Sequence, residues 1–169
     1  ERLVAEGQTV HLLDTQYRMH PAISTHASAL FYDGLLQDAP AVSGAGWQRK
    51  FHGAGFVPFM FFDLDSSAEV RDDSMSPKNP EEARLVLRLF QAIRAAAKDG
   101  GDLPRGGGAT WAAVITPYTE QLSELKRRFG ELESGRYTPE VQLNTVDAFQ
   151  GQEQDVVILS TVRAGGGGR

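Results

Sequence analysis

The chain has 169 residues, no cysteine and a formal net charge of −5, with 41% hydrophobic and 23% charged residues. These values are typical of one globular domain with a real core, and they exclude disulfides, thiol catalysis and cysteine zinc sites. The acidic balance argues against a strong stand-alone nucleic-acid binder, because neutralising phosphates requires clustered lysine and arginine. No run of about 18 apolar residues occurs, so we expect no membrane span.

The first part of the chain predicts two short strands and a helix. Residues 10–13 are typical of a short strand, and a helix is expected from about Pro21 through Phe31, because proline suits the first helical turn. Residues 37–55 are loop-like, with a proline and several glycines. The continuous apolar run at 59–62 suits a buried strand of a parallel sheet.

A long helix is predicted after a polar loop at 65–78. Asn79 is expected to cap it, with Pro80 in the first turn and Glu82 at the third position. The helix should end before Gly100, and residues 105–108 read as a flexible connection. Apolar residues of this segment recur at helical spacing and predict its core-facing stripe: Ala83, Val86, Leu87, Phe90, Ile93 and Ala97.

The last part of the chain alternates strands with a helix. Residues 111–115 predict a strand, and residues 116–118 turn the chain into a helix with an apolar face. Apolar segments at 141–146 and 156–162 complete the pattern, and the glycine-rich tail at 165–169 is expected to be flexible. This alternation predicts an α/β fold with βαβ units and a mainly parallel sheet.

The motifs of several self-sufficient catalytic centres are missing. No glycine precedes a lysine, so no phosphate-binding G-x-x-x-x-G-K-[ST] string occurs, and no adjacent Asp-Glu pair serves a metal. The strings H-E-x-x-H, G-x-S-x-G and G-x-G-x-x-G are also absent. We expect no metal site formed by these residues alone.

One informative string is Gln16-Tyr17-Arg18-Met19-His20-Pro21, directly after the first predicted strand. An aromatic ring can stack on a base, and the neighbouring guanidinium can contact a terminal phosphate through two hydrogen bonds. The plain alternative is a half-buried tyrosine beside a surface ion pair.

A second string, Thr145-Val146-Asp147-Ala148-Phe149-Gln150-Gly151-Gln152-Glu153, runs into the last apolar segment. Gly151 lets the backbone approach a ligand closely. Phe149 is expected in the core, and Gln150 either acts near phosphates or only orients the loop. The plain alternative for Glu153 is a solvated carboxylate in an ordinary turn.

Together the two strings resemble the second RecA-like motor domain of superfamily 1 nucleic-acid helicases, the group typified by senataxin and the nonsense-mediated-decay helicase. The resemblance covers about residues 3–164 and implies one domain, residues 1–164, with a three-layer RecA-like P-loop NTPase fold whose mainly parallel sheet is flanked by helices. It also implies a nucleotide site, with Arg18 as the catalytic contact to the γ-phosphate, Tyr17 on the adenine and Glu153 on the ribose. The implied ATP-binding residues are Gln16, Tyr17, Arg18, Gln150, Gly151 and Glu153.

The same resemblance implies single-stranded RNA or DNA as a partner. The implied contacts are Thr116, Pro117, Tyr118, Thr145 and Asp147. The start of a helix suits a phosphate, because exposed amides and the positive end of the helix dipole lie there. The alternative for Thr116 is a helix cap, and the basic cluster at 126–128 is either a solvated helix face or a binding patch.

The chain also departs from this family. The family's first motor domain, which carries the phosphate loop and the metal carboxylates, is absent from these residues, so Mg²⁺ and part of the ATP site are expected from that missing domain. We therefore expect a monomeric ATP-dependent helicase of the nucleus or cytoplasm as part of a longer protein, with residues 1–169 inactive alone. The alternative is a non-catalytic RecA-like remnant that binds nucleic acid or protein.

Overall fold

The computed structural model describes residues 2–43, 55–65, 67–71, 75–100, 110–132 and 138–163. The chain divides into two compact units, Glu1–Met60 and Phe61–Arg169, and each is described by itself. The connection predicted at 105–108 and the tail predicted at 165–169 lie outside the described residues.

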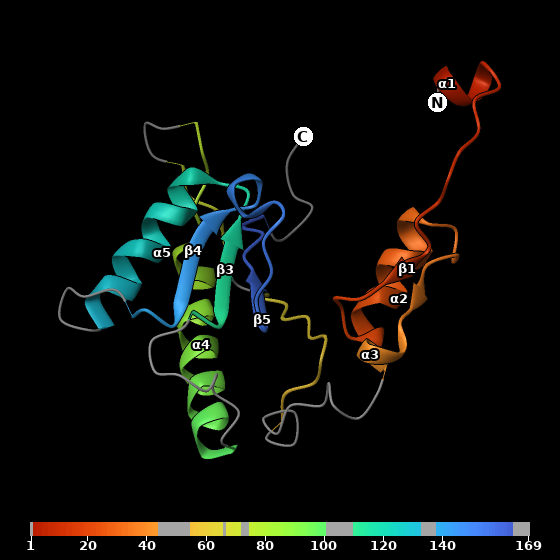
Figure 1. Cartoon of the computed structure of the whole chain (residues 1–169). Coiled ribbons are helices and arrows are strands. Elements are labelled where there is room, and N and C mark those ends of the chain that lie inside the picture. Colours follow the sequence, from red (N-terminus) through yellow and green to blue (C-terminus); the bar gives the residue numbers. More distant parts are fainter. Residues whose placement is uncertain are drawn as a thin grey trace. The chain divides into compact units, whose positions relative to one another are not determined.

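The first unit is built around a short parallel strand pair (Figure 1). Strand β1, Thr15–Gln16, pairs with β2, Gln37–Asp38, in the register Thr15 to Gln37 and Gln16 to Asp38. Helix α2, Pro21–Phe31, joins the two strands. This unit also contains two four-residue helices, α1 at Arg2–Ala5 and α3 at Pro40–Ser43.

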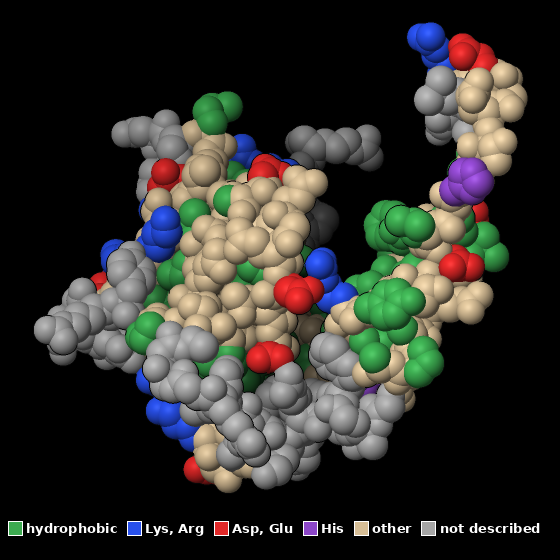
Figure 2. Space-filling view, viewed as in Figure 1, with side chains coloured by type: hydrophobic (Ala, Val, Ile, Leu, Met, Phe, Trp, Pro, Cys, Tyr) green, Lys and Arg blue, Asp and Glu red, His purple; other side chains and the backbone are tan. Residues whose placement is uncertain are grey.

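Helix α2 has the bounds that the sequence predicted. The Nδ1 atom of His20 accepts a hydrogen bond from the Ala22 amide at 3.1 Å, and Pro21 stands at the first helical position, where its missing N–H is not needed. The helix buries Ser24 and Ser28, whereas Leu30 and Phe31 are exposed. Hydrophobic side chains are therefore visible on the surface of this unit in Figure 2.

The prediction of a strand at 10–13 was wrong. The structure has no regular element there, and Leu13 is 86% exposed. An isolated strand is unstable in water without partners that satisfy its backbone, and no described segment pairs with these residues. Within the described residues of the first unit, the parallel pair begins further along, at Thr15 and Gln16.

The second unit contains a parallel three-stranded sheet in the order β4-β3-β5. Its strands are β3, Ala112–Thr116, β4, Val141–Thr145, and β5, Val156–Leu159. Helix α5, Thr119–Leu132, connects β3 to β4, and helix α4, Pro80–Gly100, precedes the sheet in sequence. Both helices start at the predicted turns. The parallel pairing of β3 with β4 and with β5 confirms the mainly parallel α/β architecture.

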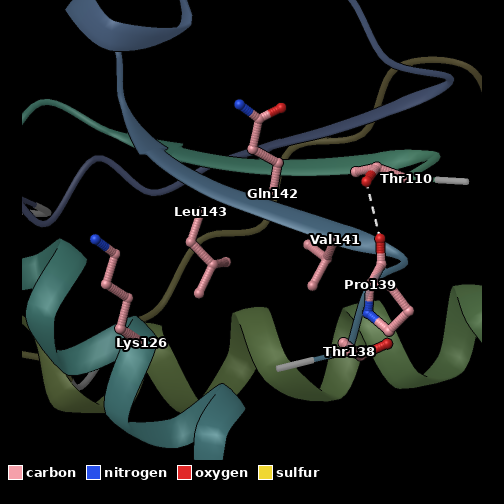
Figure 3. A pocket seen from close by; sticks show the side chains of 7 residues that line it. All are labelled: Thr110, Lys126, Thr138, Pro139, Val141, Gln142 and Leu143. Atoms are coloured by element: carbon pink, nitrogen blue, oxygen red, sulfur yellow. Dashed lines mark hydrogen bonds between the residues drawn. The ribbon is translucent and has the colours of Figure 1, made fainter. Parts of the chain in front are cut away.

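Helices α4 and α5 lie on the same side of the strands (Figure 3). In that view Val141 and Leu143 of β4 point toward the helices and Gln142 points away. The Phe90 ring of α4 packs against Trp111 and against Phe129 of α5, with ring centroids 5.7 and 5.4 Å apart. Five members of the predicted apolar stripe of α4 are confirmed as core by burial: Ala83, Val86, Phe90, Ile93 and Ala97. The sixth, Leu87, is only half-buried.

The apolar run at 59–62 is not the buried strand that was predicted. It forms no regular element, and Phe61 is 81% exposed. The last apolar segment is also shorter than predicted, because β5 ends at Leu159 and its residues alternate between half-buried and exposed. β5 pairs with β3 on one side, and no other described strand covers its second edge.

Candidate functional site

The string at 16–21 forms a tight turn around the side chain of Gln16. Its Oε1 atom accepts hydrogen bonds from the Arg18 and Met19 amides at 2.9 and 2.7 Å. Its Nε2 atom donates to the Met19 carbonyl at 2.8 Å and to the carboxylate of Asp38. Gln16 is buried, and both polar atoms of its side-chain amide are used in hydrogen bonds that shape the turn.

Asp38 ties this turn to helix α2. Its Oδ1 atom also accepts a hydrogen bond from the Ser24 hydroxyl at 2.6 Å. The hydrogen bonds from Ser24 and Gln16 hold the pKa of Asp38 below its ordinary value, because both stabilise the ionised carboxylate. The turn is thus fixed by β1, β2 and α2 together.

The turn displays the two residues that follow Gln16. Tyr17 is 71% exposed, and Arg18 is also exposed. An exposed ring beside an exposed guanidinium, on a backbone held by a buried amide, is an arrangement that can accept a base and a phosphate. His20, the last polar residue of the string, caps helix α2.

The predicted nucleic-acid contacts of the second unit start where β3 and β4 end. Thr116 and Thr145 face each other in the parallel register, and the Val146 amide donates to the Thr116 carbonyl at 3.1 Å. Thr116 is fully buried, and its hydroxyl accepts a hydrogen bond from the Tyr118 amide at 3.4 Å. Pro117 is exposed and Tyr118 half-buried, so the side chains available here are those after Thr116.

The string at 145–153 forms a short 3-10 helix, η3, at Asp147–Phe149, and then a loop. The Thr145 hydroxyl accepts a hydrogen bond from the Ala148 amide at 3.2 Å, and Phe149 is buried, as expected for a core residue. Gln152 donates to the Ala148 carbonyl at 2.9 Å, which folds the loop back on η3.

Gly151 has φ of +80°, a conformation that favours glycine. The loop leaves Asp147, Gln150 and Glu153 exposed. A shallow hollow beside η3 is lined by Ile115, Val146, Asp147, Phe149 and Gln150. This hollow brings together one residue of the predicted nucleic-acid set, Asp147, and one of the predicted ATP set, Gln150.

A second hollow lies at the opposite end of the same sheet (Figure 3). It is lined by Thr110, Lys126, Thr138, Pro139, Val141, Gln142 and Leu143. Apart from Lys126 of α5, these residues come from β4 and from the segments that lead into β3 and β4, away from the polar loops at the carboxyl ends of the strands. None of the predicted site residues lines it.

Two of the three basic residues at 126–128 are engaged in ion pairs. Arg127 pairs with Glu124 and Glu131, and Arg128 pairs with Glu124. The hydrogen bond from Arg127 lowers the pKa of Glu124 despite its partial burial. Charges neutralised within one helix favour the interpretation as a solvated helix face over that of a binding patch.

Sequence reasoning missed a group of buried polar side chains at the carboxyl end of the sheet. Asn79, Gln121 and Ser160 are all fully buried. Gln121 could have been found, because it stands one turn before the apolar Leu125 on the core-facing stripe of α5. A polar residue on such a stripe implies a buried hydrogen-bond partner.

Within the described residues, no group of three or more histidine or acidic side chains is arranged to hold a metal ion. No helix of that part is both long and apolar enough to cross a membrane. The nucleotide contacts predicted at 16–18 belong to the first unit, and those predicted at 150–153 belong to the second.

The fold and these loops define a class of protein. A parallel sheet flanked by helices, with polar loops after the carboxyl ends of its strands, is the α/β architecture of RecA-like NTPase domains. The family model described as AAA domain matches residues 1–169. The chain therefore belongs to this AAA domain family, within the superfamily 1 helicases.

Three relatives illustrate the membership. The chain is 34% identical to Helicase SEN1 of Saccharomyces cerevisiae over 94% of its length, and 36% identical to Probable helicase MAGATAMA 3 of Arabidopsis thaliana over 100%. It is 34% identical to DNA-binding protein SMUBP-2 of Mesocricetus auratus over 97% of its length. The matched regions span 7%, 20% and 16% of those relatives, in the same order.

Proposed function

We propose that this chain is the second RecA-like motor lobe of an ATP-dependent RNA or DNA helicase. It would act within a longer protein whose other lobe supplies the phosphate loop and most of the Mg²⁺ coordination. The observation that carries this proposal is the turn at 16–19, whose buried Gln16 amide displays Tyr17 and Arg18 together. The helicase names of the relatives support it.

On the nucleotide side, Arg18 contacts the γ-phosphate, Tyr17 packs on the adenine and Glu153 binds the ribose. Gln150 and Gly151 complete the contacts near the phosphates. Gln16 acts by holding the turn rather than by touching ATP, because both polar atoms of its side chain are bonded within the protein. ATP supplies the γ-phosphate whose cleavage drives the cycle.

On the nucleic-acid side, the segment after β3 and the loop after β4 grip one strand. Pro117, Tyr118 and Asp147 offer accessible side chains, while Thr116 and Thr145 shape the two loops through hydrogen bonds to backbone amides. Closing and opening of the cleft between the lobes would shift this grip along the strand. Residues 1–169 alone would have no ATPase activity, because the phosphate loop lies in the other lobe.

The role of Arg18 can be tested in the longer protein that contains this chain. Arg18→Ala should lower kcat of the strand-stimulated ATPase by about 10³-fold, the effect typical of a lost arginine finger. Folding should be preserved, because Arg18 is exposed. Steady-state ATPase rates and a thermal unfolding curve measure the two quantities.

Arg84→Ala is the matched control, because Arg84 is also an exposed arginine and pairs only with its helical neighbour Glu81 among the ion pairs seen here. It should leave the ATPase rate unchanged. Wild-type turnover in Arg18→Ala would remove the assigned role. A longer protein that binds single strands without any ATPase would instead favour the non-catalytic alternative.

A further inference from the structure

The buried polar side chains at the carboxyl end of the sheet form one connected network. Gln121 accepts a hydrogen bond from the Asn79 amide at 2.8 Å and donates to the Ser160 hydroxyl at 2.9 Å. The Asn79 side chain donates to the Val162 carbonyl at 3.3 Å and to the Ser67 hydroxyl at 3.1 Å. The network therefore joins the amino ends of α4 and α5 to the segment that follows β5.

Asn79 caps helix α4, as the sequence predicted, but this uses only one of its side-chain atoms. Its Oδ1 atom accepts a hydrogen bond from the Glu82 amide at 3.0 Å. The Glu82 side chain does not close a reciprocal capping box; it accepts a hydrogen bond from the Thr161 amide at 2.7 Å. Both residues therefore reach from the helix start to the chain at 161–162.

The segment held in this way is strained. Val162 has φ of +68°, which is a genuine outlier for a β-branched residue. The Arg163 amide donates to the Thr161 carbonyl at 2.7 Å, closing a turn over Val162, and positive φ at the centre of such a γ-turn is the strained form. Strain of this kind persists only where surrounding contacts over-determine it.

The strained turn places Arg163 beside a predicted nucleic-acid contact. The Arg163 guanidinium lies over the Tyr118 ring, 5.9 Å from its centroid, and its Nε atom pairs with Glu69 at 3.2 Å. Tyr118 directly precedes helix α5, whose residue Gln121 belongs to the network. The ring is thus connected to the network from two sides, through the adjoining helix and through Arg163.

We propose that Asn79 and Gln121 are positioning residues that lock the turn at 160–163 and so fix the Tyr118 ring for the nucleic-acid strand. This inference rests on the proposed function, since it deepens the grip assigned to Tyr118. Without the network, Val162 relaxes from its strained conformation, Arg163 leaves the ring, and the strand loses an ordered stacking surface. The contacts proposed for ATP are not affected by these changes.

Asn79→Ser in the longer protein separates the two roles of Asn79, which are to cap helix α4 and to hold the turn at 160–163. Serine can still accept a hydrogen bond from the Glu82 amide as a cap, but it is too short to donate to the Val162 carbonyl. The concentration of single-stranded RNA that half-stimulates the ATPase should rise about tenfold, the scale of a lost base-stacking contact. The kcat at saturating RNA should stay nearly unchanged.

A purely structural effect is excluded by a matched control and by a local readout. Phe90→Leu weakens the core of the same unit without touching the network, and it should leave the RNA concentration dependence unchanged. Amide hydrogen exchange at 160–163 should accelerate in Asn79→Ser and Gln121→Leu, but not in Phe90→Leu. In the Asn79→Ser background, Val162→Gly should partly restore RNA affinity, because glycine adopts positive φ without strain.

Two results would overturn the positioning role. One is unchanged exchange at 160–163 in Asn79→Ser, and the other is an equal loss of RNA affinity in Phe90→Leu. Failure of the proposed function is a different result: a wild-type protein that shows neither RNA binding nor strand-stimulated ATPase. In that case the exchange measurement still decides whether the network holds the turn.

Discussion

At the scale of single residues, burial decides which members of a motif can meet a ligand. Gln16 and Thr116 are both predicted site residues, yet both are buried, and their polar atoms bond to the backbone of their own turns. Tyr17 and Pro117, one position later in each case, are exposed. The residue types predict which ligands a motif could bind. The hydrogen bonds and the burial show which of its residues shape the turn and which side chains the turn exposes to a ligand.

Val162 offers a test of strain at this scale. Glycine in the middle of a helix or strand is normally worse than alanine by about 0.5–1 kcal/mol. At Val162 the order should reverse, with Val162→Gly more stable than Val162→Ala by about 1 kcal/mol, because the left-handed conformation penalises a Cβ atom. The free energy of unfolding from urea denaturation measures the difference.

Val114 of β3 supplies the control for this comparison, because it is equally buried but lies in a regular strand. There alanine should be the better substitute. If glycine is also the worse residue at position 162, the turn is not strained as described.

At the scale of elements, the sequence predicted the helices better than the strands. Helix α2 follows from its proline and cap, and α4 from its asparagine cap and apolar stripe, because these signals are local. Local signals could not decide whether residues 59–62 form a strand, because a strand is stable only where another strand pairs with it. The same reason limits 10–13, where the local apolar pattern resembles that of a true strand.

The position of the candidate residues after strands was predictable from the sequence, whereas their roles stay predictions. The network of Asn79, Gln121 and Ser160 was not predictable, because its members come from three separate parts of the chain. The strain at Val162 has no sequence signal either, since valine is a common strand residue. Such features depend on tertiary contacts, which composition and periodicity do not encode.

The anchoring of the 16–19 turn to β2 predicts a pH dependence. Because folding lowers the pKa of Asp38, its ionised form stabilises the folded state above the ordinary pKa of about 3.9, and this contribution is lost as the pH falls through the folded-state value. Asp38→Asn keeps an acceptor oxygen but removes the charge. It should lower the thermal midpoint at pH 7, and its difference from wild type should shrink toward pH 3.

Ser24→Ala is a useful companion variant, because the Ser24 hydroxyl is the largest cause of the lowered pKa. In this variant the pKa of Asp38, followed by carboxyl carbon NMR, should move up toward its ordinary value. A difference between Asp38→Asn and wild type that is the same at pH 7 and pH 3 would show that the charge of Asp38 does not stabilise the turn.

At the scale of the whole molecule, the proposed function makes the chain one lobe of a nucleotide-driven motor. The chain spans between 7% and 20% of the relatives compared here, and its described residues hold no cluster of metal ligands. It offers a ring and a guanidinium in the first unit and an exposed carboxylate in the second. The proposed function requires that one nucleotide contacts all three of these groups.

The most direct test is a structure of the longer protein bound to a non-hydrolysable ATP analogue and Mg²⁺. We expect Arg18 and Glu153 within hydrogen-bond distance, about 3 Å, of the γ-phosphate and the ribose, with the Tyr17 ring stacked on the adenine. The central claim is contradicted if the analogue binds elsewhere, or if Tyr17, Arg18 and Glu153 lie on separate surfaces while it is bound.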